Sequence, residues 1–81
     1  ITESVFDKAV IYPNPTKGEL HIDNVIVDKA TIYDVLGKLI KTKIFTDGSD
    51  NNTINLTGSP GIYYIYIESQ GNTIVKKIVV E

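Results

Sequence analysis

Hydrophobic and polar residues alternate along most of the chain with the two-residue period of a β-strand, and no segment keeps a helical period over three turns. In residues 19–23 (ELHID), Leu20 and Ile22 fall on one face and polar residues fall on the other. Turn signals interrupt such runs about every 8 to 12 residues. The pattern predicts seven short strands, at residues 5–12, 19–23, 29–35, 38–45, 53–56, 62–68 and 73–80.

This series of strands predicts an all-β fold, a seven-stranded antiparallel immunoglobulin-like β-sandwich. A small closed barrel is disfavoured, because the chain has seven strands rather than eight and its hairpins do not repeat evenly. The chain lacks cysteine and tryptophan, so any likeness to antibody domains is one of architecture. Residues 62–68 (IYYIYIE) form the most apolar run and are predicted to be a central strand with both faces partly covered.

Prolines and a glycine end the first strand in the stretch IYPNPTKGEL, residues 11–20. Pro13 and Pro15 have no N–H to donate to a strand ladder, so the first strand must stop there. Asn14 is expected to bond neighbouring backbone groups in place of the lost ladder. Gly18 then permits the reversal into the second strand.

Two further polar segments are predicted to be a turn and a loop. In residues 34–37 (DVLG), Asp34 can bond its own backbone and Gly37 tolerates a positive φ. Residues 46–52 (TDGSDNN) form an oxygen-rich loop that invites a calcium site. The loop fails the EF-hand template, because Asn52 stands at the sixth position, where that template requires glycine.

Composition narrows the range of functions. The 81 residues suffice for one domain with a modest core, and the absence of cysteine excludes disulfides and thiol chemistry. That absence points to a cytosolic protein or to a bacterial exported domain held together by its sheets. All eight basic residues are lysines, which disfavours nucleic-acid binding, since arginine is best suited to bidentate phosphate and base recognition. The lysines are scattered, and no apolar run approaches the roughly 18 to 20 residues of a membrane span, so membrane insertion is not expected.

The sequence offers no catalytic or cofactor-binding constellation. Motifs for a nucleophile elbow, an HExxH zinc site and a phosphate loop are absent. His21, the only histidine, is predicted to face outward with Glu19 and Asp23, and a metal site would need at least three converging ligands. We therefore expect no enzyme activity, no cofactor and no metal.

Tyrosines and lysines near the end of the chain have both structural and binding interpretations. Tyr63 is predicted to point into the core, with its hydroxyl capping a loop. Tyr64 and Tyr66 should lie on the opposite face, where they form either cross-strand packing or an aromatic platform for a sugar. Lys76 and Lys77 place one amine on each face of the last strand, where they protect an exposed edge or contact a partner.

Three pieces of the sequence together resemble a known family. They are VIYPNPTKGELHI, ATIYDVLGKLIKT and INLTGSPGIYYIYIESQGNTIVKKIVVE. In this order they are similar to the C-terminal sorting domain of type IX secretion cargo, the type A or Por secretion sorting domain. The resemblance covers residues 9–81 and leaves residues 1–8 as the end of a linker and the start of the first strand. The chain opens with Ile1 rather than methionine, so we expect it to be a fragment of something larger.

The resemblance implies that the domain is a sorting signal rather than an enzyme. Such a domain is covalently part of a larger cargo protein that a signal peptide takes to the periplasm. An outer-membrane translocon and its shuttle protein then recognise the domain. On the cell surface a sortase typically removes it, and the mature protein is released or joined to lipopolysaccharide. The fold implied by the family is again an immunoglobulin-like sandwich.

The residues that match the family motifs are the candidates for translocon recognition. One departure occurs at Ser59, where relatives often place a leucine before the proline. The candidate residues are Pro13, Asn14, Pro15, Gly18, Asp34, Gly37, Lys38, Gly61, Tyr63, Lys76, Lys77, Ile78, Val79 and Val80.

Two competing functions and one alternative assembly remain open from the sequence. An immunoglobulin-like or carbohydrate-binding accessory module of a secreted enzyme would share the fold, and a small enzyme would need a pocket that the sequence does not suggest. If the chain is a sorting domain, we expect the translocon to read the last strand by main-chain pairing with lysine contacts. Exposed sheet edges also leave room for an edge-paired dimer.

Overall fold

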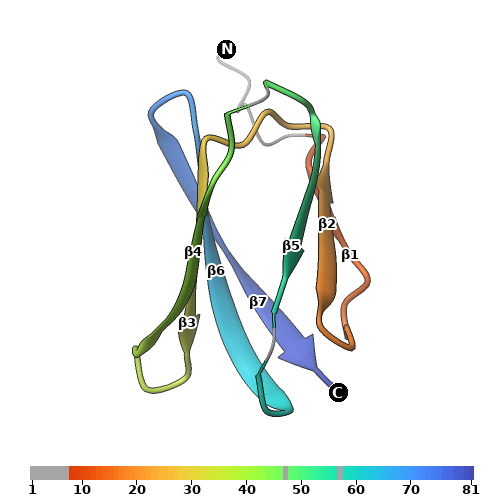
Figure 1. The fold of residues 1–81 in the computed structure, drawn as a ribbon, viewed down its shortest axis with the longest axis vertical. Coiled ribbons are helices and arrows are strands. Elements are labelled where there is room, and N and C mark those ends of the chain that lie inside the picture. Colours follow the sequence, from red (N-terminus) through yellow and green to blue (C-terminus); the bar gives the residue numbers. More distant parts are fainter. Residues whose placement is uncertain (1–7, 47, 57) are drawn as a thin grey trace.

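The computed structural model describes residues 8–46, 48–56 and 58–81, and all regular secondary structure in these ranges is β-strand (Figure 1). The strands form two facing antiparallel sheets, one in the order β1-β2-β5 and the other in the order β4-β3-β6-β7. This arrangement confirms the predicted seven-stranded immunoglobulin-like sandwich. The strands are β1 (Val10–Tyr12), β2 (Glu19–Asp23), β3 (Lys29–Asp34), β4 (Leu39–Ile44), β5 (Asn51–Asn55), β6 (Gly61–Ser69) and β7 (Asn72–Val80).

Two predicted boundaries differ from the structure. The first strand was predicted to span residues 5–12, but β1 begins only at Val10, and residues 5–7 lie outside the described residues. The predicted polar loop ends too late, because Asn51 and Asn52 already belong to β5 and pair with β2. Residue 47 of that loop also lies outside the described residues. The ends of the other strands agree with the prediction to within one or two residues, the usual uncertainty of element boundaries.

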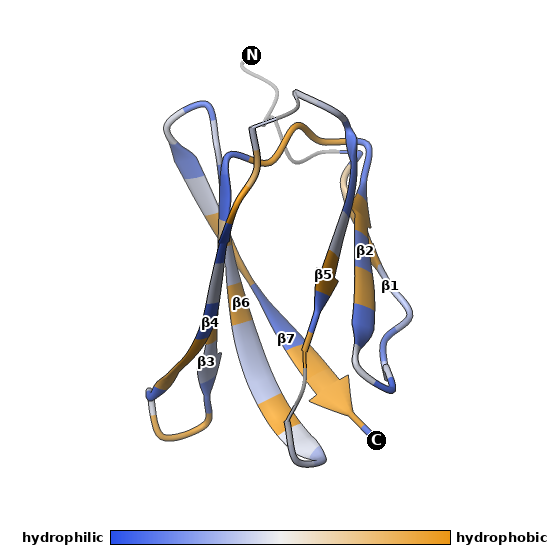
Figure 2. Cartoon of the chain, viewed as in Figure 1, coloured by the Kyte–Doolittle hydropathy of each residue, from blue (hydrophilic) through white to orange (hydrophobic). Residues whose placement is uncertain are grey.

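The core lies between the two sheets and is built from alternate residues of each strand. Leu20 and Ile22 of β2 are fully buried, as their alternation with polar residues predicts, and Figure 2 shows this alternation along the strand. Burying a branched aliphatic side chain contributes about 1.5–3 kcal/mol. The buried hydrophobic residues are Leu20, Ile22, Val25, Val27, Ala30, Ile32, Ile54, Leu56, Tyr63, Ile65, Ile67, Ile78 and Val80.

Strand β6 is central in its sheet, between β3 and β7, as predicted. Tyr63 points inward and is 7% exposed, and its hydroxyl donates to the carbonyl of Ser59 at 2.6 Å. The prediction of a buried tyrosine that caps a loop is therefore confirmed. Tyr64 and Tyr66 lie on the outer face and remain partly exposed. Tyr66 packs edge-to-face against Tyr33 of β3, with 5.2 Å between ring centroids.

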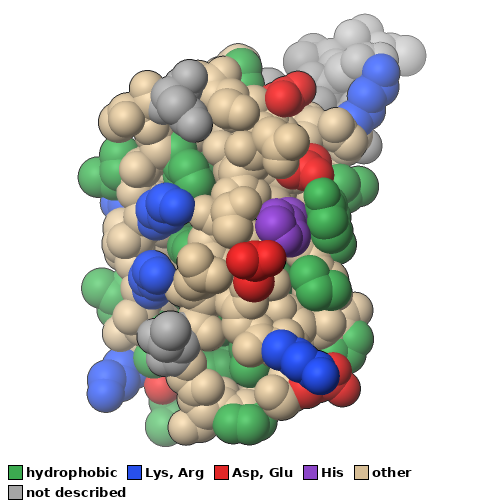
Figure 3. Space-filling view, turned by 45° about the vertical axis from the view of Figure 1, so that its right-hand side comes forward, with side chains coloured by type: hydrophobic (Ala, Val, Ile, Leu, Met, Phe, Trp, Pro, Cys, Tyr) green, Lys and Arg blue, Asp and Glu red, His purple; other side chains and the backbone are tan. Residues whose placement is uncertain are grey.

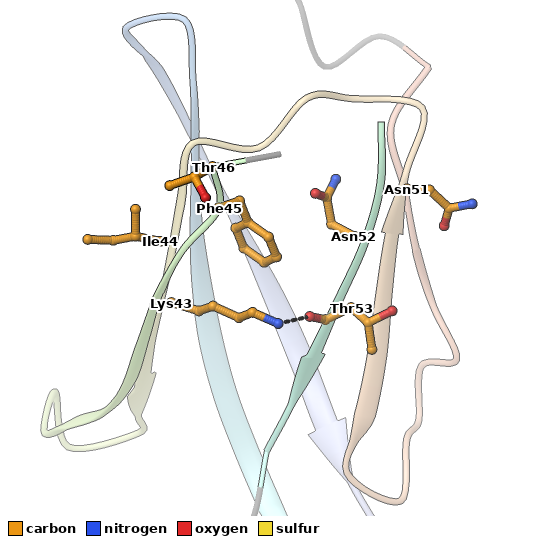
Figure 4. Close-up of a pocket in the computed structure, with 7 residues that line it drawn as sticks. All are labelled: Lys43, Ile44, Phe45, Thr46, Asn51, Asn52 and Thr53. Atoms are coloured by element: carbon orange, nitrogen blue, oxygen red, sulfur yellow. Dashed lines mark hydrogen bonds between the residues drawn. The ribbon is translucent and has the colours of Figure 1, made fainter. Parts of the chain in front are cut away.

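Lysine side chains close one side of the sandwich, where the edge strands β4 and β5 face each other (the β4–β5 side; Figure 1). Lys41 Nζ donates to the carbonyl of Asn55 at 2.6 Å, and Lys43 Nζ donates to the carbonyl of Thr53 at 2.7 Å. Both amines therefore satisfy outward carbonyls of β5 that have no further strand to pair with. Figure 4 shows Lys43 crossing from one sheet to the other.

Candidate functional site

Segments that are far apart in the sequence meet at one end of the sandwich. The connections at residues 13–18, 35–38 and 58–60 and the last residue, Glu81, all lie at the lower end in Figure 1. We call this the C-terminal end. Most predicted recognition residues lie in these segments or at the strand ends beside them, and only Lys76 and Lys77 lie farther along β7. Those at the C-terminal end are Pro13, Asn14, Pro15, Gly18, Asp34, Gly37, Lys38, Gly61, Tyr63, Ile78, Val79 and Val80.

The side chain of Asn14 joins the first motif to the last strand. Its Nδ2 donates to the carbonyl of Lys77 at 3.0 Å, and the Val79 N–H donates to its Oδ1 at 3.1 Å. The asparagine amide thus takes the place of a peptide group beside the open edge of β7. We expected Asn14 to bond nearby backbone, but its partners lie more than 60 residues away in the sequence.

The backbone continues this pairing beyond Asn14. The Thr16 N–H donates to the carbonyl of Val79 at 2.8 Å, and the Glu81 N–H donates to the carbonyl of Thr16 at 2.8 Å. Thr16 therefore forms a parallel bridge with the end of β7. The chain leaves one sheet after β1 and joins the edge of the other. The Tyr12-Pro13 and Asn14-Pro15 peptide bonds are both cis.

Thr16 and Gly18 hold this segment against the rest of the fold. Thr16 is buried, and its hydroxyl donates to the carbonyl of Glu19 at 2.6 Å while accepting from the Gly18 N–H at 3.0 Å. Gly18 has a φ of +133°, and a Cβ there would lie 2.9 Å from the carbonyl oxygen of Leu56. The sequence predicted the reversal at Gly18, but the close approach of Leu56 depends on tertiary structure.

The second motif forms a tightly bonded turn between β3 and β4. Asp34 Oδ1 accepts from the N–H groups of Leu36 and Lys38 at 2.9 and 2.8 Å. Gly37 has a φ of +85° and donates its N–H to the carbonyl of Asp34 at 3.0 Å. These contacts confirm the predicted roles of Asp34 and Gly37. The turn presents Leu36, which is 90% exposed, and Val35, which is 66% exposed.

The exposed pair Val35 and Leu36 was not among the predicted site residues. The available signal was the presence of two apolar residues inside a four-residue turn, where polar residues are usual. The hydrogen bonds of Asp34 order the backbone of the turn, which directs both apolar side chains outward. Exposed apolar side chains grouped in one place can mark an interaction site.

Lys76 and Lys77 lie on an edge strand, because β7 pairs with β6 on one side only. Lys76 shares the inward face of β7 with Ile74 and Ile78, and Lys77 lies on the opposite face. The predicted placement of one amine on each face is therefore confirmed. Within the described ranges, neither ammonium group forms a hydrogen bond or an ion pair.

The outer face of the smaller sheet carries a polar cluster around His21 (Figure 3). His21 Nε2 lies 2.9 Å from Glu19 Oε1, and its ring stacks on Tyr12 with 5.2 Å between centroids. The Tyr12 hydroxyl donates to the Asp23 carboxylate, and this hydrogen bond, with burial and the negative charge of Asp23, raises the pKa of Tyr12 above its usual value. The part of the chain that the structure describes contains no group of three acidic or histidine side chains able to hold a metal.

A shallow pocket of about 270 Å³ lies between the sheets on the β4–β5 side (Figure 4). Lys43 spans it, with its amine 4.9 Å from the centroid of the Phe45 ring. Asn52 is buried beside it and donates its Nδ2 to the carbonyls of Ile22 and Val25, at 3.2 and 3.0 Å. The pocket is therefore lined by groups that mainly connect the two sheets.

The fold and the C-terminal end together define a small immunoglobulin-like module in which two turn motifs and the last strand share one surface. The model of the family described as secretion system C-terminal sorting domain matches residues 10–81, and the chain belongs to that family. A search of curated proteins finds no match to the chain. Over the described residues, no helix is long and apolar enough to span a membrane.

Family membership confirms the resemblance seen in the sequence. The domain is a C-terminal sorting signal of the type IX secretion system, and it belongs to a larger cargo protein that this system exports. The family is one of sorting signals rather than of catalysts.

Proposed function

We propose that the type IX translocon and its shuttle protein recognise the folded C-terminal end of this domain. The observation that carries the proposal is the contact of Asn14 with Lys77 and Val79, which joins the first and last motifs into one surface. These motifs lie together only when the chain is folded. A signal read as an unfolded peptide would not need that contact.

The exposed turn of Val35 and Leu36 is the proposed anchor of this surface. Both side chains are apolar and exposed, and the Asp34 hydrogen bonds order the backbone of the turn before a partner arrives. Binding then loses little conformational entropy at this turn, which favours affinity. Lys38 follows the turn and supplies a positive charge beside the apolar anchor. The remaining motif residues hold the segments in register.

The proposed route follows from recognition at the outer membrane. The cargo passes through the periplasm with the domain folded and then reaches the cell surface or the medium. A surface sortase removes the domain, with release of the cargo or its attachment to lipopolysaccharide. The Asn14 and Thr16 contacts and the buried core stabilise the domain without disulfides, as the periplasmic stage requires.

The test is export of a fluorescent reporter in a host that carries the type IX system. The reporter, with a signal peptide, precedes residues 1–81, and a matched fusion lacks these residues. Leu36→Ser is the informative variant, because a side chain that is 90% exposed contributes little to the core. We expect export of the reporter to depend on residues 1–81. In Leu36→Ser, export should fall about tenfold, because one apolar anchor is lost. Equal export of Leu36→Ser and wild type would refute the proposed anchor.

A second candidate function rests on a hollow on the outer face of the larger sheet. Tyr33, Tyr64 and Tyr66 line it together with residues of the β3–β4 turn, in a volume of about 340 Å³. Exposed tyrosines can stack on sugars, but the edge-to-face contact of Tyr33 with Tyr66 engages these rings with each other. We expect no binding of the isolated domain on a glycan array. Binding that Tyr64→Ala abolishes would favour the carbohydrate-binding module instead.

A further inference from the structure

The open edge of β7 is covered along only part of its length. Lys77 O and both backbone groups of Val79 point away from β6 and are bonded by Asn14 and Thr16. Because backbone groups alternate sides along a strand, those of Thr73 and Val75 and the Lys77 N–H point the same way. No described residue is bonded to these groups. Among the residues that the structure describes, nothing pairs with this side of residues 73–77, and this stretch of sheet edge ends at Asn14.

A groove runs beside this unpaired edge, between β1 and β7. Its volume is about 160 Å³, and it is lined by Ala9, Ile11, Asn14, Ile67, Ile74, Lys76, Lys77 and Ile78. The lining is mainly aliphatic, and the two lysines bring positive charge. Within the described part of the chain, neither lysine has an anionic partner. The groove therefore offers main-chain pairing, an apolar face and two cations that no described acidic residue pairs with.

We propose that an extended segment of a type IX secretion partner adds as a strand beside residues 73–77 of β7. Alternate side chains of this segment are apolar and enter the groove, and a carboxylate meets Lys76 or Lys77. The pairing stops at Asn14, which already occupies the edge beyond it. This inference rests on the proposed function and names a second contact, separate from the Leu36 turn.

Charge favours such a partner over a second copy of the domain. Antiparallel pairing of residues 73–77 with a second β7 places Lys77 opposite Thr73 and Lys76 opposite Ile74, and it brings four lysines and no carboxylate to one strand pair. Pairing of β7 with β4 of another copy (LIKTKI) likewise adds only lysines. Gathering charges of one sign on a strand pair is unfavourable. An acidic extended segment gains from the same lysines.

The sharpest variant is Val75→Pro, which deletes an outward N–H and leaves the pairing of β7 with β6 intact. Proline is tolerated on edge strands for this reason. Val75→Ala is the matched side-chain control. Thr42→Pro is the matched edge control, because Phe45 donates its N–H to Asp28 and alternation therefore directs the Thr42 N–H away from β3.

The measurement is export of the reporter fusion, with thermal unfolding of each purified domain to confirm folding. We expect Val75→Pro to fold and to lower export about tenfold, the effect of one or two lost hydrogen bonds and a blocked strand. Val75→Ala and Thr42→Pro should export like wild type. The double variant Lys76→Glu with Lys77→Glu, which leaves the backbone unchanged, should lower export similarly.

Each outcome decides the inference. Export of Val75→Pro at the wild-type level would overturn strand addition and leave the sorting function unaffected. If Val75→Pro does not fold, wild-type export of the Lys76→Glu with Lys77→Glu variant would overturn it in the same way. Absence of export from the wild-type fusion would overturn both. The third outcome is that analytical ultracentrifugation shows a dimer of the purified domain, that Val75→Pro is monomeric, and that export is unchanged. This result would overturn the proposal and assign the edge to a second copy of the domain.

Discussion

The two sides of the sandwich are closed by different means. On the β4–β5 side, Lys41 and Lys43 reach from β4 to carbonyls of β5 in the facing sheet. On the side where β1 meets β7 (the β1–β7 side), the Asn14 amide and the backbone of Thr16 pair directly with the strand edge. The first solution uses flexible side chains, and the second fixes the chain in strand geometry.

The difference separates a replaceable closure from one on which the proposed recognition surface depends. Long lysine side chains lose rotamer freedom when they bond, so their net contribution is small, and other polar residues could replace them. Asn14 has a short side chain with a donor and an acceptor at fixed spacing, and both are used. The first and last motifs that match the family therefore meet on the side where geometry is most constrained, whereas the second motif forms the β3–β4 turn.

The strongest way to break the β1–β7 side is Gly18→Ala. The new Cβ would lie 2.9 Å from the carbonyl oxygen of Leu56, at a φ of +133° that side chains rarely adopt. We expect a loss of about 2–4 kcal/mol in the free energy of unfolding, measured in urea. Gly71→Ala is the control, because its φ is also positive but its Cβ meets nothing within 4 Å. Equal losses for both variants would argue against the close approach at Gly18.

Asn14→Ala tests the joining contact itself. It removes both hydrogen bonds to β7 and leaves Lys77 O and Val79 N–H to water. The expected loss is about 1–2 kcal/mol. Asn14→Asp keeps the acceptor for Val79 but places a carboxylate oxygen against the Lys77 carbonyl, so its loss should be at least as large as that of Asn14→Ala. A loss from Asn14→Asp well below that of Asn14→Ala would contradict the account of a donor and an acceptor that are both in use.

Replacing both Lys41 and Lys43 with methionine should affect stability less than Asn14→Ala. The methionines keep the apolar stems but not the amines that bond Asn55 and Thr53. We expect a combined loss of less than about 1 kcal/mol in urea unfolding. A loss greater than that of Asn14→Ala would reverse the comparison between the two sides.

The smallest expected effect depends on pH and concerns Tyr12, at the end of β1. Its hydrogen bond to Asp23 raises the pKa of Tyr12, so the fold favours the protonated phenol. The stabilisation is fully present below the ordinary tyrosine pKa of about 10 and is lost as pH rises through the higher folded value. Wild type should unfold at a higher temperature than Tyr12→Phe at pH 8, and the gap should close in strongly alkaline solution. A gap independent of pH would contradict this assignment.

Local patterns sufficed where the structure obeys local rules. The alternation in β2 predicted its buried face, and the turn chemistry of Asp34 and Gly37 predicted the β3–β4 turn. The buried position of Tyr63 and the hydrogen bond from its hydroxyl to a loop were predicted from its place in a central strand. In each case the pattern that carried the prediction lies within the element or within a few residues of it.

Contacts fixed by topology could not be read from the sequence. Asn14 bonds β7 because the chain changes sheets after β1, and no nearby residue signals that partner. The polar run at residues 46–52 predicts a loop that includes Asn52. Asn52 lies in β5 because its buried amide donates to two carbonyls, those of Ile22 and Val25.

The most direct test of the central claim compares export between Asn14→Ala and the double lysine variant of the β4–β5 side. Both fusions are expressed in a type IX host, at a temperature where unfolding curves show each domain to be folded. If the folded C-terminal end is the signal, Asn14→Ala should lose most of its export while the lysine variant retains it. Equal export from the two variants would contradict the claim and would mean that the translocon recognises residues outside the Asn14 contact.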